Sequence, residues 1–189
     1  MRIFIFFAVA MMVVGCAGVP ADESGAQTVL GVATLDNLHR VSGDLYRSEQ
    51  PDEMTFKQLE DAGIKSVLNL RRHHSDEDDA AQTELFLCEL PINAGDLTES
   101  QIRAALLLIH SMPKPVLVHC WHGSDRTGAV VASYRVVMEN WNIEDAIAEL
   151  EREEFGHHRT VYRNIPRLLR SINWDKMRAD ISGNQPVTL

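Results

Sequence analysis

The segment at residues 116–128 constrains the fold more than any other part of the chain, because it joins a strand pattern to a helix through a short polar loop. It reads VLVHCWHGSDRTG. Residues 116–118 are short and apolar enough for a strand that is buried on both faces of a sheet. Apolar residues follow the loop from Ala129 to Met138. A strand, a loop and a helix in this order predict one unit of an α/β fold.

The loop between Cys120 and Arg126 has the chemistry of an anion-binding site. Backbone N–H groups that turn inward at a helix N-terminus suit a phosphoryl group, and so does the positive end of the helix dipole. The same field favours the thiolate form of Cys120, and the thiolate is the form in which a cysteine acts as a nucleophile. Arg126 can bind two phosphoryl oxygens through its planar fork, which a lysine cannot do. Gly123 permits a tight turn in the loop, and Gly128 lets the following helix pack closely.

The rest of the chain alternates strand and helix patterns and then continues in helices. Strands are predicted at residues 38–41, 45–47, 64–70, 85–90 and 116–118, and helices at 52–62, 98–112, 129–138, 143–150 and 165–172. A capping box at residues 98–101 marks the start of the second helix. This order predicts an α/β fold with a central, mostly parallel sheet flanked by helices.

Size and charge limit the number of domains and the class of partner. The 189 residues give room for one domain of ordinary size with short extensions. The chain has 18 basic and 27 acidic residues, and it contains no basic run that would neutralise a nucleic-acid backbone. A nucleic-acid partner is therefore not expected, and the net charge of −9 also disfavours polyanionic substrates.

The first sixteen residues differ from the rest and indicate an export signal. Arg2 precedes an uncharged apolar run from Ile3 to Val14, which is shorter than the about 20 residues of a membrane span. The Val-Val-Gly-Cys sequence that ends at Cys16 resembles the lipobox of bacterial lipoproteins, in which cleavage precedes the cysteine and that cysteine carries the lipid. An ordinary signal peptide or an uncleaved anchor is the alternative.

We therefore predict four parts of the chain. They are a signal peptide at 1–15, a lipidated N-terminus and tether at 16–33, a catalytic domain at 34–174 and a polar tail at 175–189. With several acyl chains on Cys16, the mature protein would be an exported lipoprotein, anchored in a membrane and facing the periplasm or the cell exterior.

The sequence HCWHGSDRTG matches the His-Cys-x5-Arg-Ser/Thr-Gly signature of the protein tyrosine phosphatase superfamily. Residues 45–48 and 63–71 and the region around Phe155 and Gly156 resemble the dual-specificity branch, particularly its small bacterial exported members. The resemblance spans roughly residues 35–172, and it implies the fold of the cysteine-dependent phosphatases.

The resemblance also implies roles for the residues of the signature. Cys120 would be the nucleophile, Arg126 would bind phosphate, and the hydroxyl of Thr127 would help the thiolate to leave. His119 would orient the loop through hydrogen bonds. The other positions of the predicted phosphate-binding loop are Trp121, His122, Gly123, Ser124, Asp125 and Gly128.

The family also uses an aspartate from a separate loop to protonate the leaving oxygen and then to activate water. We assign this role to Asp96, which follows a predicted strand and lies just before a capped helix. Asp76, Asp78 and Asp79, in the loop at 71–81, are weaker candidates.

Several other residues have two interpretations. Cys88 is predicted to fill the core, although a reversible disulfide with Cys120 is the alternative. The histidine pairs at 73–74 and 157–158 lack the partners of a metal site and are interpreted as solvated loop residues. Trp121 is predicted to be buried, with contact to a substrate ring as the alternative. Arg71 and Arg72 either flank the pocket or form an exposed pair.

These observations predict a hydrolase that removes phosphate from phosphotyrosine in proteins through a phosphocysteine intermediate, without metal or cofactor. Phosphoserine and phosphothreonine are further candidate substrates. The negative charge of Asp125 disfavours polyphosphorylated ligands, so we place an inositol phosphate second. An inactive phosphoprotein-binding module, and a sulfurtransferase or arsenate reductase, are alternatives from other functional classes.

Overall fold

The computed structural model describes residues 29–32 and 35–183, and its centre is a five-stranded sheet with the order β1-β2-β5-β3-β4. The strands are β1 (His39–Arg40), β2 (Leu45–Ser48), β3 (Ser66–Asn69), β4 (Phe86–Glu89) and β5 (Val116–His119). Only the β1–β2 pair is antiparallel among the described pairs. This arrangement confirms the predicted α/β fold with a mostly parallel central sheet.

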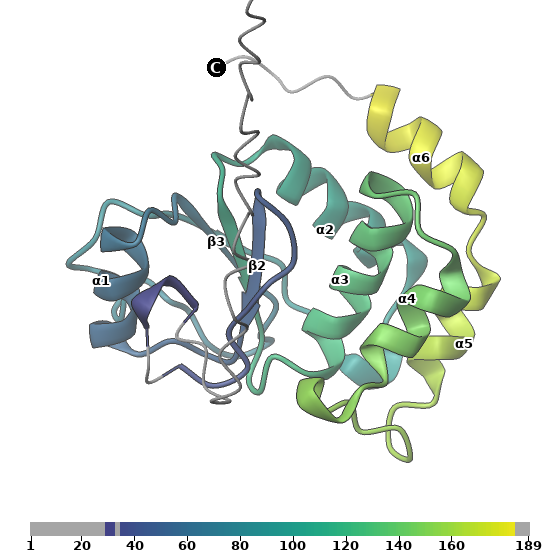
Figure 1. The fold of residues 1–189 in the computed structure, drawn as a ribbon, viewed down its shortest axis with the longest axis horizontal. Coiled ribbons are helices and arrows are strands. Elements are labelled where there is room, and N and C mark those ends of the chain that lie inside the picture. The colour runs from purple at the N-terminus through teal and green to yellow at the C-terminus, as the bar shows by residue number, and fades with distance from the viewer. Residues whose placement is uncertain (1–28, 33–34, 184–189) are drawn as a thin grey trace, which may run out of the picture.

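The two faces of the sheet pack against different helices. On one face Tyr46, Val67 and Leu117 pack with Phe56 and Leu59 of α1 (Glu53–Asp61). Residues that alternate with these along the strands point to the opposite face, because successive side chains of a strand alternate in direction. This face packs against the larger group of helices, and Figure 1 shows α1 on one side of the strands and α2 to α6 on the other.

The larger helical layer is built around α3 (Asp125–Met138). It contacts α2 (Glu99–Ser111), α4 (Ile143–Leu150), α5 (Asn164–Ser171) and α6 (Trp174–Gly183). Most residues of α3 are buried, which agrees with the absence of a polar stripe in its apolar central part. The helix is therefore enclosed by protein, and its first turn is held in a fixed position relative to the sheet.

Local sequence signals explain where several elements begin. Thr98 and Gln101 form the predicted capping box of α2, and Asp52 and Thr55 form a second box at the start of α1. Three short 3₁₀ turns complete the fold: η1 (Val29–Gly31), η2 (Ala94–Asp96) and η3 (Glu153–Phe155). Two of them, η2 and η3, lie in the connections that surround the functional site.

The predicted polar tail is wrong in its first part. Residues Trp174–Gly183 form α6, in which Met177 and Ile181 are buried in the main core. The indole N–H of Trp174 donates to the Leu169 carbonyl at 3.0 Å and so ties the start of α6 to α5. Two apolar residues one turn apart are enough to dock this helix, although the rest of the segment is polar.

The predicted signal peptide, Cys16 and most of the tether lie outside the described residues. Within residues 29–32 and 35–183, the structure contains no helix that is both long and apolar enough to span a bilayer.

Candidate active site

The predicted phosphate-binding loop lies at the carboxyl end of β5, in the middle of the sheet. It leaves the sheet after His119 and enters α3 at Asp125. Because β2 and β3 flank β5, residues from their carboxyl ends surround the loop. Cys120 lies at the base of this loop with only 2% of its surface exposed. A parallel sheet places ligands at this edge, where the helix N-terminus also attracts anions.

The shape of the loop depends on two glycines. Gly123 has φ +68°, and a Cβ atom there would lie 2.5 Å from the backbone carbonyl of Ser48. A Cβ at Gly128 would lie 2.3 Å from a methyl carbon of Leu150 in α4. The first position therefore needs glycine both for its backbone conformation and for space, and the second needs it so that α3 and α4 can approach.

A buried arginine supports the loop from below. Arg47 of β2 is 1% exposed, and its Nη2 donates to the Gly123 carbonyl at 2.6 Å. Its guanidinium carbon lies 4.2 Å from the centre of the Phe155 ring. Burial lowers the pKa of the Arg47 guanidinium to about 10. No role was predicted for Arg47 from the sequence. A charged residue inside a short apolar strand is nevertheless unusual and indicates that the residue has a specific role.

Arg126 is anchored by backbone carbonyls that follow two neighbouring strands. Its Nη1 lies 3.3 Å from the Leu70 carbonyl and 3.5 Å from the Ile92 carbonyl. These contacts use one nitrogen of a group that carries five N–H donors, so the others remain for a ligand.

Thr127, the next residue, is fully buried, and its Oγ1 has no hydrogen-bond partner among the described residues. Ser124, earlier in the loop, is buried and donates from its Oγ to the His122 carbonyl at 3.2 Å. The loop therefore places a guanidinium and an unengaged hydroxyl next to each other in the sequence.

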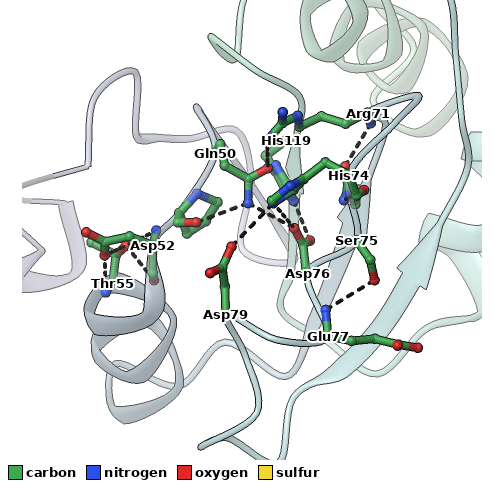
Figure 2. A network of polar contacts seen from close by, with 12 residues as sticks. Gln50, Asp52, Thr55, Arg71, His74, Ser75, Asp76, Glu77, Asp79 and His119 are labelled. Atoms are coloured by element: carbon green, nitrogen blue, oxygen red, sulfur yellow. Dashed lines mark hydrogen bonds and ion pairs between the residues drawn. The ribbon is translucent and has the colours of Figure 1, made fainter.

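A buried carboxylate holds the start of the loop, as Figure 2 shows. His119 Nε2 donates to Asp76 Oδ2 at 2.8 Å, and His119 Nδ1 lies 3.2 Å from the Cys120 carbonyl. Gln50 donates to Asp76 Oδ1 at 2.9 Å. Burial on its own raises the pKa of Asp76, but the hydrogen bonds from His119 and Gln50 outweigh it and hold this pKa below its ordinary value. Asp76 is thus a support for His119 and is fully occupied in that role.

A second carboxylate connects the loop to the segment after η3. Asp125 Oδ1 accepts from His157 Nδ1 at 2.8 Å and from the His158 backbone N–H at 2.9 Å, and Oδ2 accepts from His158 Nδ1 at 2.8 Å. Burial raises the pKa of Asp125, but these bonds outweigh it, so the pKa is lowered overall. The interpretation of both histidines as solvated is wrong for His157, whose side chain is fully buried. The His158 side chain is 48% exposed.

The loop opens onto a cavity of about 480 Å³. Its walls come from the loop, from the start of η2, from the segment after β3 and from the segment before α5. The lining residues are Arg72, Ile92, Asn93, Ala94, Trp121, His122, Asp125, Arg126, His158, Val161 and Tyr162. Arg126 is therefore in the wall of a cavity that has both cationic and aromatic groups.

Trp121 lies at the mouth of this cavity, not in the core. Its side chain is 55% exposed, so the prediction that it is buried is wrong. The guanidinium carbon of Arg71 lies 4.1 Å from the centre of the indole ring, and Arg71 Nη1 donates to Gln50 Oε1 at 3.0 Å. Arg72 lines the cavity. The two arginines therefore flank the site, one by supporting Trp121 and the other as part of the wall.

Asp96 lies beside the cavity. It is exposed at the end of η2, and its Oδ2 accepts from Asn93 Nδ2 at 2.6 Å. Asn93 and Ala94 line the cavity, whereas Asp96 is not among the lining residues. Asn164 in α5 donates to the Ala94 carbonyl at 2.7 Å and holds the turn in place.

Cys88 does not lie near enough to Cys120 for a disulfide. Cys88 pairs in register with Leu68, and Leu68 pairs with Val118, two residues before Cys120. Two strand spacings of about 4.8 Å separate the β4 and β5 backbones, which exceeds the about 4.4–6.8 Å between the Cα atoms of a disulfide. Cys88 is partly buried and packs against the main core, so it fills the core less completely than predicted.

Within the described ranges, no three His, Cys, Asp or Glu side chains are arranged so as to hold a metal ion.

Comparisons with known proteins show what this site resembles. The model of the tyrosine phosphatase family matches residues 32–175. The dual specificity protein phosphatase TpbA of Pseudomonas aeruginosa (strain UCBPP-PA14) is 32% identical over 125 residues, which are 64% of this chain and 56% of TpbA. The chain therefore matches little more than half the length of that relative.

Solved structures agree with the sequence comparison. A crystal structure of a P. aeruginosa TpbA variant in complex with pTyr has a TM-score of 0.71 and 27% identity, and covers 78% of this chain and 91% of that one. The core catalytic domain of the PP-IP phosphatase SIW14 from S. cerevisiae has a TM-score of 0.68 and 23% identity, and covers 79% and 93%. At that identity the second likeness concerns the fold alone. The chain belongs to the tyrosine phosphatase family, in its dual-specificity branch.

Proposed function

We propose that this protein hydrolyses phosphotyrosine in proteins, with Cys120 as the nucleophile. The observation that carries this proposal is the cavity above the loop, which combines Arg126 in its wall with an exposed indole at its mouth. A guanidinium suits the phosphoryl oxygens, and an aromatic surface suits the phenol ring of the substrate. The TpbA variant whose structure contains pTyr gives independent support.

The proposed reaction has two steps. In the first, the Cys120 thiolate attacks phosphorus, an S–P bond forms, and the P–O bond to the substrate breaks as Asp96 gives a proton to the leaving oxygen. In the second, water attacks phosphorus, Asp96 takes a proton from that water, and the S–P bond breaks. The buried hydroxyl of Thr127, which has no other partner in the described residues, would donate to the departing thiolate.

Asp96 accepts from Asn93 through Oδ2, so its other carboxylate oxygen is the one that would carry the transferred proton. Support for this role comes from its position on η2, since two other residues of that turn region line the cavity. We expect Asp96→Asn to lower turnover by about 10²–10⁴-fold, the usual contribution of a positioned acid. Asp78→Asn, in the loop at 71–81, is the matched control and should retain full turnover. Full activity in Asp96→Asn would remove the assignment.

The substrate class rests on the mouth of the cavity more than on the charge of Asp125. Both oxygens of Asp125 accept hydrogen bonds from the histidines. The electrostatic repulsion that we expected between Asp125 and polyphosphorylated ligands is therefore weaker than a free carboxylate would give. The exposed Trp121, held by Arg71, favours a flat aromatic group next to the phosphate. An inositol phosphate offers no such ring, and it remains the competing substrate in the test below.

The test is phosphate release from a phosphotyrosine peptide by the full-length chain in a non-ionic detergent, with EDTA present. We expect activity that persists with EDTA, falls to background in Cys120→Ser and persists in Cys88→Ser, the matched cysteine control. Faster release from inositol polyphosphates than from the peptide would replace the proposed substrate. Peptide binding without any release by folded, reduced protein would replace the enzyme with a binding module.

We also propose that Cys16 carries a lipid and that the protein is held at a membrane facing the periplasm or the cell exterior. The lipobox-like sequence before Cys16 supports this proposal. Cells that express the protein should incorporate a labelled fatty acid into it, and Cys16→Ala should abolish the label. Label that persists in the Cys16→Ala variant would contradict the proposal that Cys16 carries the lipid.

A further inference from the structure

A second cavity, which we call the rear cavity, is lined by Arg47, the residue that donates to the Gly123 carbonyl of the phosphate-binding loop. Its volume is about 260 Å³, and it shares no lining residue with the first cavity. It is lined by β1, β2, α3, α4 and the η3 region through His39, Arg40, Val41, Arg47, Val131, Arg135, Glu149, Arg152, Glu154 and Phe155. Four of these residues are arginines, which is an unusual density for one small cavity in a chain with net charge −9.

The carboxylates around this cavity satisfy only part of its positive charge. Glu149 is fully engaged with Arg135, whose Nε and Nη2 donate to its two oxygens at 2.9 and 2.7 Å. Glu139, outside the cavity, accepts from the same arginine at 2.6 Å. Glu154 lies only within 3.7 Å of Arg152, and both side chains are more than half exposed. Arg135 therefore binds two of these three carboxylates, and Glu154 lies near Arg152. Among the described residues neither Arg40 nor Arg47 forms an ion pair, although Arg40 Nε donates to the Ser42 carbonyl at 3.1 Å and the charge of Glu149 acts on Arg47.

Arg47 has the strongest need for a partner. It is 1% exposed, its Nη2 is bound to the Gly123 carbonyl, and its buried Nε has no hydrogen-bond partner among the described residues. A buried cation whose donors are only partly satisfied costs free energy, and a negative charge in the cavity that Arg47 lines would offset part of this cost through the charge of the guanidinium. The neighbouring His39 has a pKa below its ordinary value, chiefly because of burial and then because of the charge of Arg47, which the charge of Glu154 partly opposes.

We propose that this rear cavity binds a small oxyanion, with inorganic phosphate, the product of the proposed reaction, as its ligand. Arg47, Arg40 and Arg152 provide the cationic groups, and His39 provides a further polar group. The volume of about 260 Å³ holds a phosphate with several bridging waters, since one water occupies about 30 Å³. Arg47 connects the bound anion to the phosphate-binding loop, because its Nη2 donates to the Gly123 carbonyl at 2.6 Å.

The proposal is tested by titrating the full-length chain, in detergent, with inorganic phosphate while recording amide NMR spectra. The phosphate-binding loop is itself a site for phosphate, so the wild-type protein should show two saturable sites. Arg126→Met should lose the site on the substrate side and keep the rear site, which is reported by the amides of Val41 and Phe155. The double variant Arg40→Met and Arg152→Met should keep the first and weaken the rear site by at least about tenfold.

Arg167→Met, at an exposed position of α5, is the matched control for loss of an arginine and should retain both sites. Arg126→Met and the double variant are each expected to lose a different phosphate site. A general folding defect in one of them would therefore not imitate the expected result. A single site in the wild type that disappears in Arg126→Met would overturn the proposal. So would rear binding that is unchanged in the double variant. Neither outcome bears on phosphotyrosine hydrolysis, which the activity assay tests separately.

Discussion

At the level of single residues, the phosphate-binding loop depends on atoms that touch its hidden face. The Gly123 carbonyl accepts from Arg47, and a Cβ at Gly123 would clash with the backbone of Ser48. Both supporting residues belong to β2, the strand beside β5. The conformation of the loop is therefore fixed by the neighbouring strand as well as by its own sequence.

Gly123→Ala should disable the enzyme while leaving most of the fold intact. The new Cβ would lie 2.5 Å from the Ser48 carbonyl carbon, and φ +68° is strained for alanine. We expect a loss of about 1–3 kcal/mol in the free energy of unfolding and a loss of turnover of roughly 10²-fold, as misplacement of a site by about 1 Å produces.

Gly43→Ala is the control, because a Cβ there meets only the end of the Arg40 side chain at 3.9 Å. It should change turnover and thermal stability little. Denaturant unfolding and phosphatase assays on both variants measure the two effects. Normal turnover in Gly123→Ala would mean that the loop tolerates a different backbone path.

The difference between what sequence predicted and what it missed follows from the range of the interactions. Cys120, Arg126 and Thr127 were assigned from one contiguous signature, and the structure places Cys120 directly after β5 and the other two in the first turn of α3. Arg47 and Asp76 were not assigned as supports, because both are distant in sequence from their partners in the loop. Arg47 lies 76 positions before Gly123, and Asp76 lies 43 positions before His119. A single sequence carries no signal for such pairings beyond the unusual presence of a charged residue among buried neighbours.

At the level of elements, the connection between β3 and β4 shows how a segment without helix or strand can be rigid. Within it, Asp76 is 2% exposed and accepts hydrogen bonds from His119 and Gln50. Figure 2 shows this carboxylate between the two donors, with His74 nearby. The sequence correctly predicted a loop here, but its anchoring by one buried carboxylate required the fold.

Asp76→Asn should weaken the fold in a pH-dependent manner. The pKa of Asp76 is lower in the folded protein than its ordinary value of about 3.9, so its carboxylate stabilises the fold fully above about pH 4. That contribution is lost as the pH falls through the lowered pKa of the folded state. We expect the variant to be about 1–3 kcal/mol less stable at neutral pH, and the gap to narrow in acid.

Melting temperatures between neutral pH and about pH 3 measure this gap. Asp78→Asn, an exposed aspartate of the same connection, should follow the wild type throughout. A gap between Asp76→Asn and wild type that stays constant down to pH 3 would show that the charge of Asp76 is not what stabilises the loop.

At the level of the whole molecule, two cores on opposite faces of one sheet hold the site at the carboxyl ends of the strands. The larger core extends from the strands through α3 to α6, the outermost helix of that layer in Figure 1. Sequence analysis predicted the alternation of strands and helices, since the apolar runs are long and regular. It missed α6, because only Met177 and Ile181 are buried apolar residues in a segment whose other residues include Asp175, Lys176 and Arg178.

The role of α6 is to complete the core without contributing to the chemistry, and Ile181→Ala tests this. Ile181 is 1% exposed and packs in the cluster that contains α2 and α3. Removing its methyl groups should cost about 2–5 kcal/mol in the free energy of unfolding, whereas kcat should stay within about twofold because no cavity-lining residue belongs to α6. Lys176→Ala, an exposed change on the same helix, should cost less than about 1 kcal/mol. Denaturant titration and turnover at a temperature where both variants are folded separate the two effects. If turnover in Ile181→Ala fell with stability intact, α6 would have to influence the phosphate-binding loop through α3.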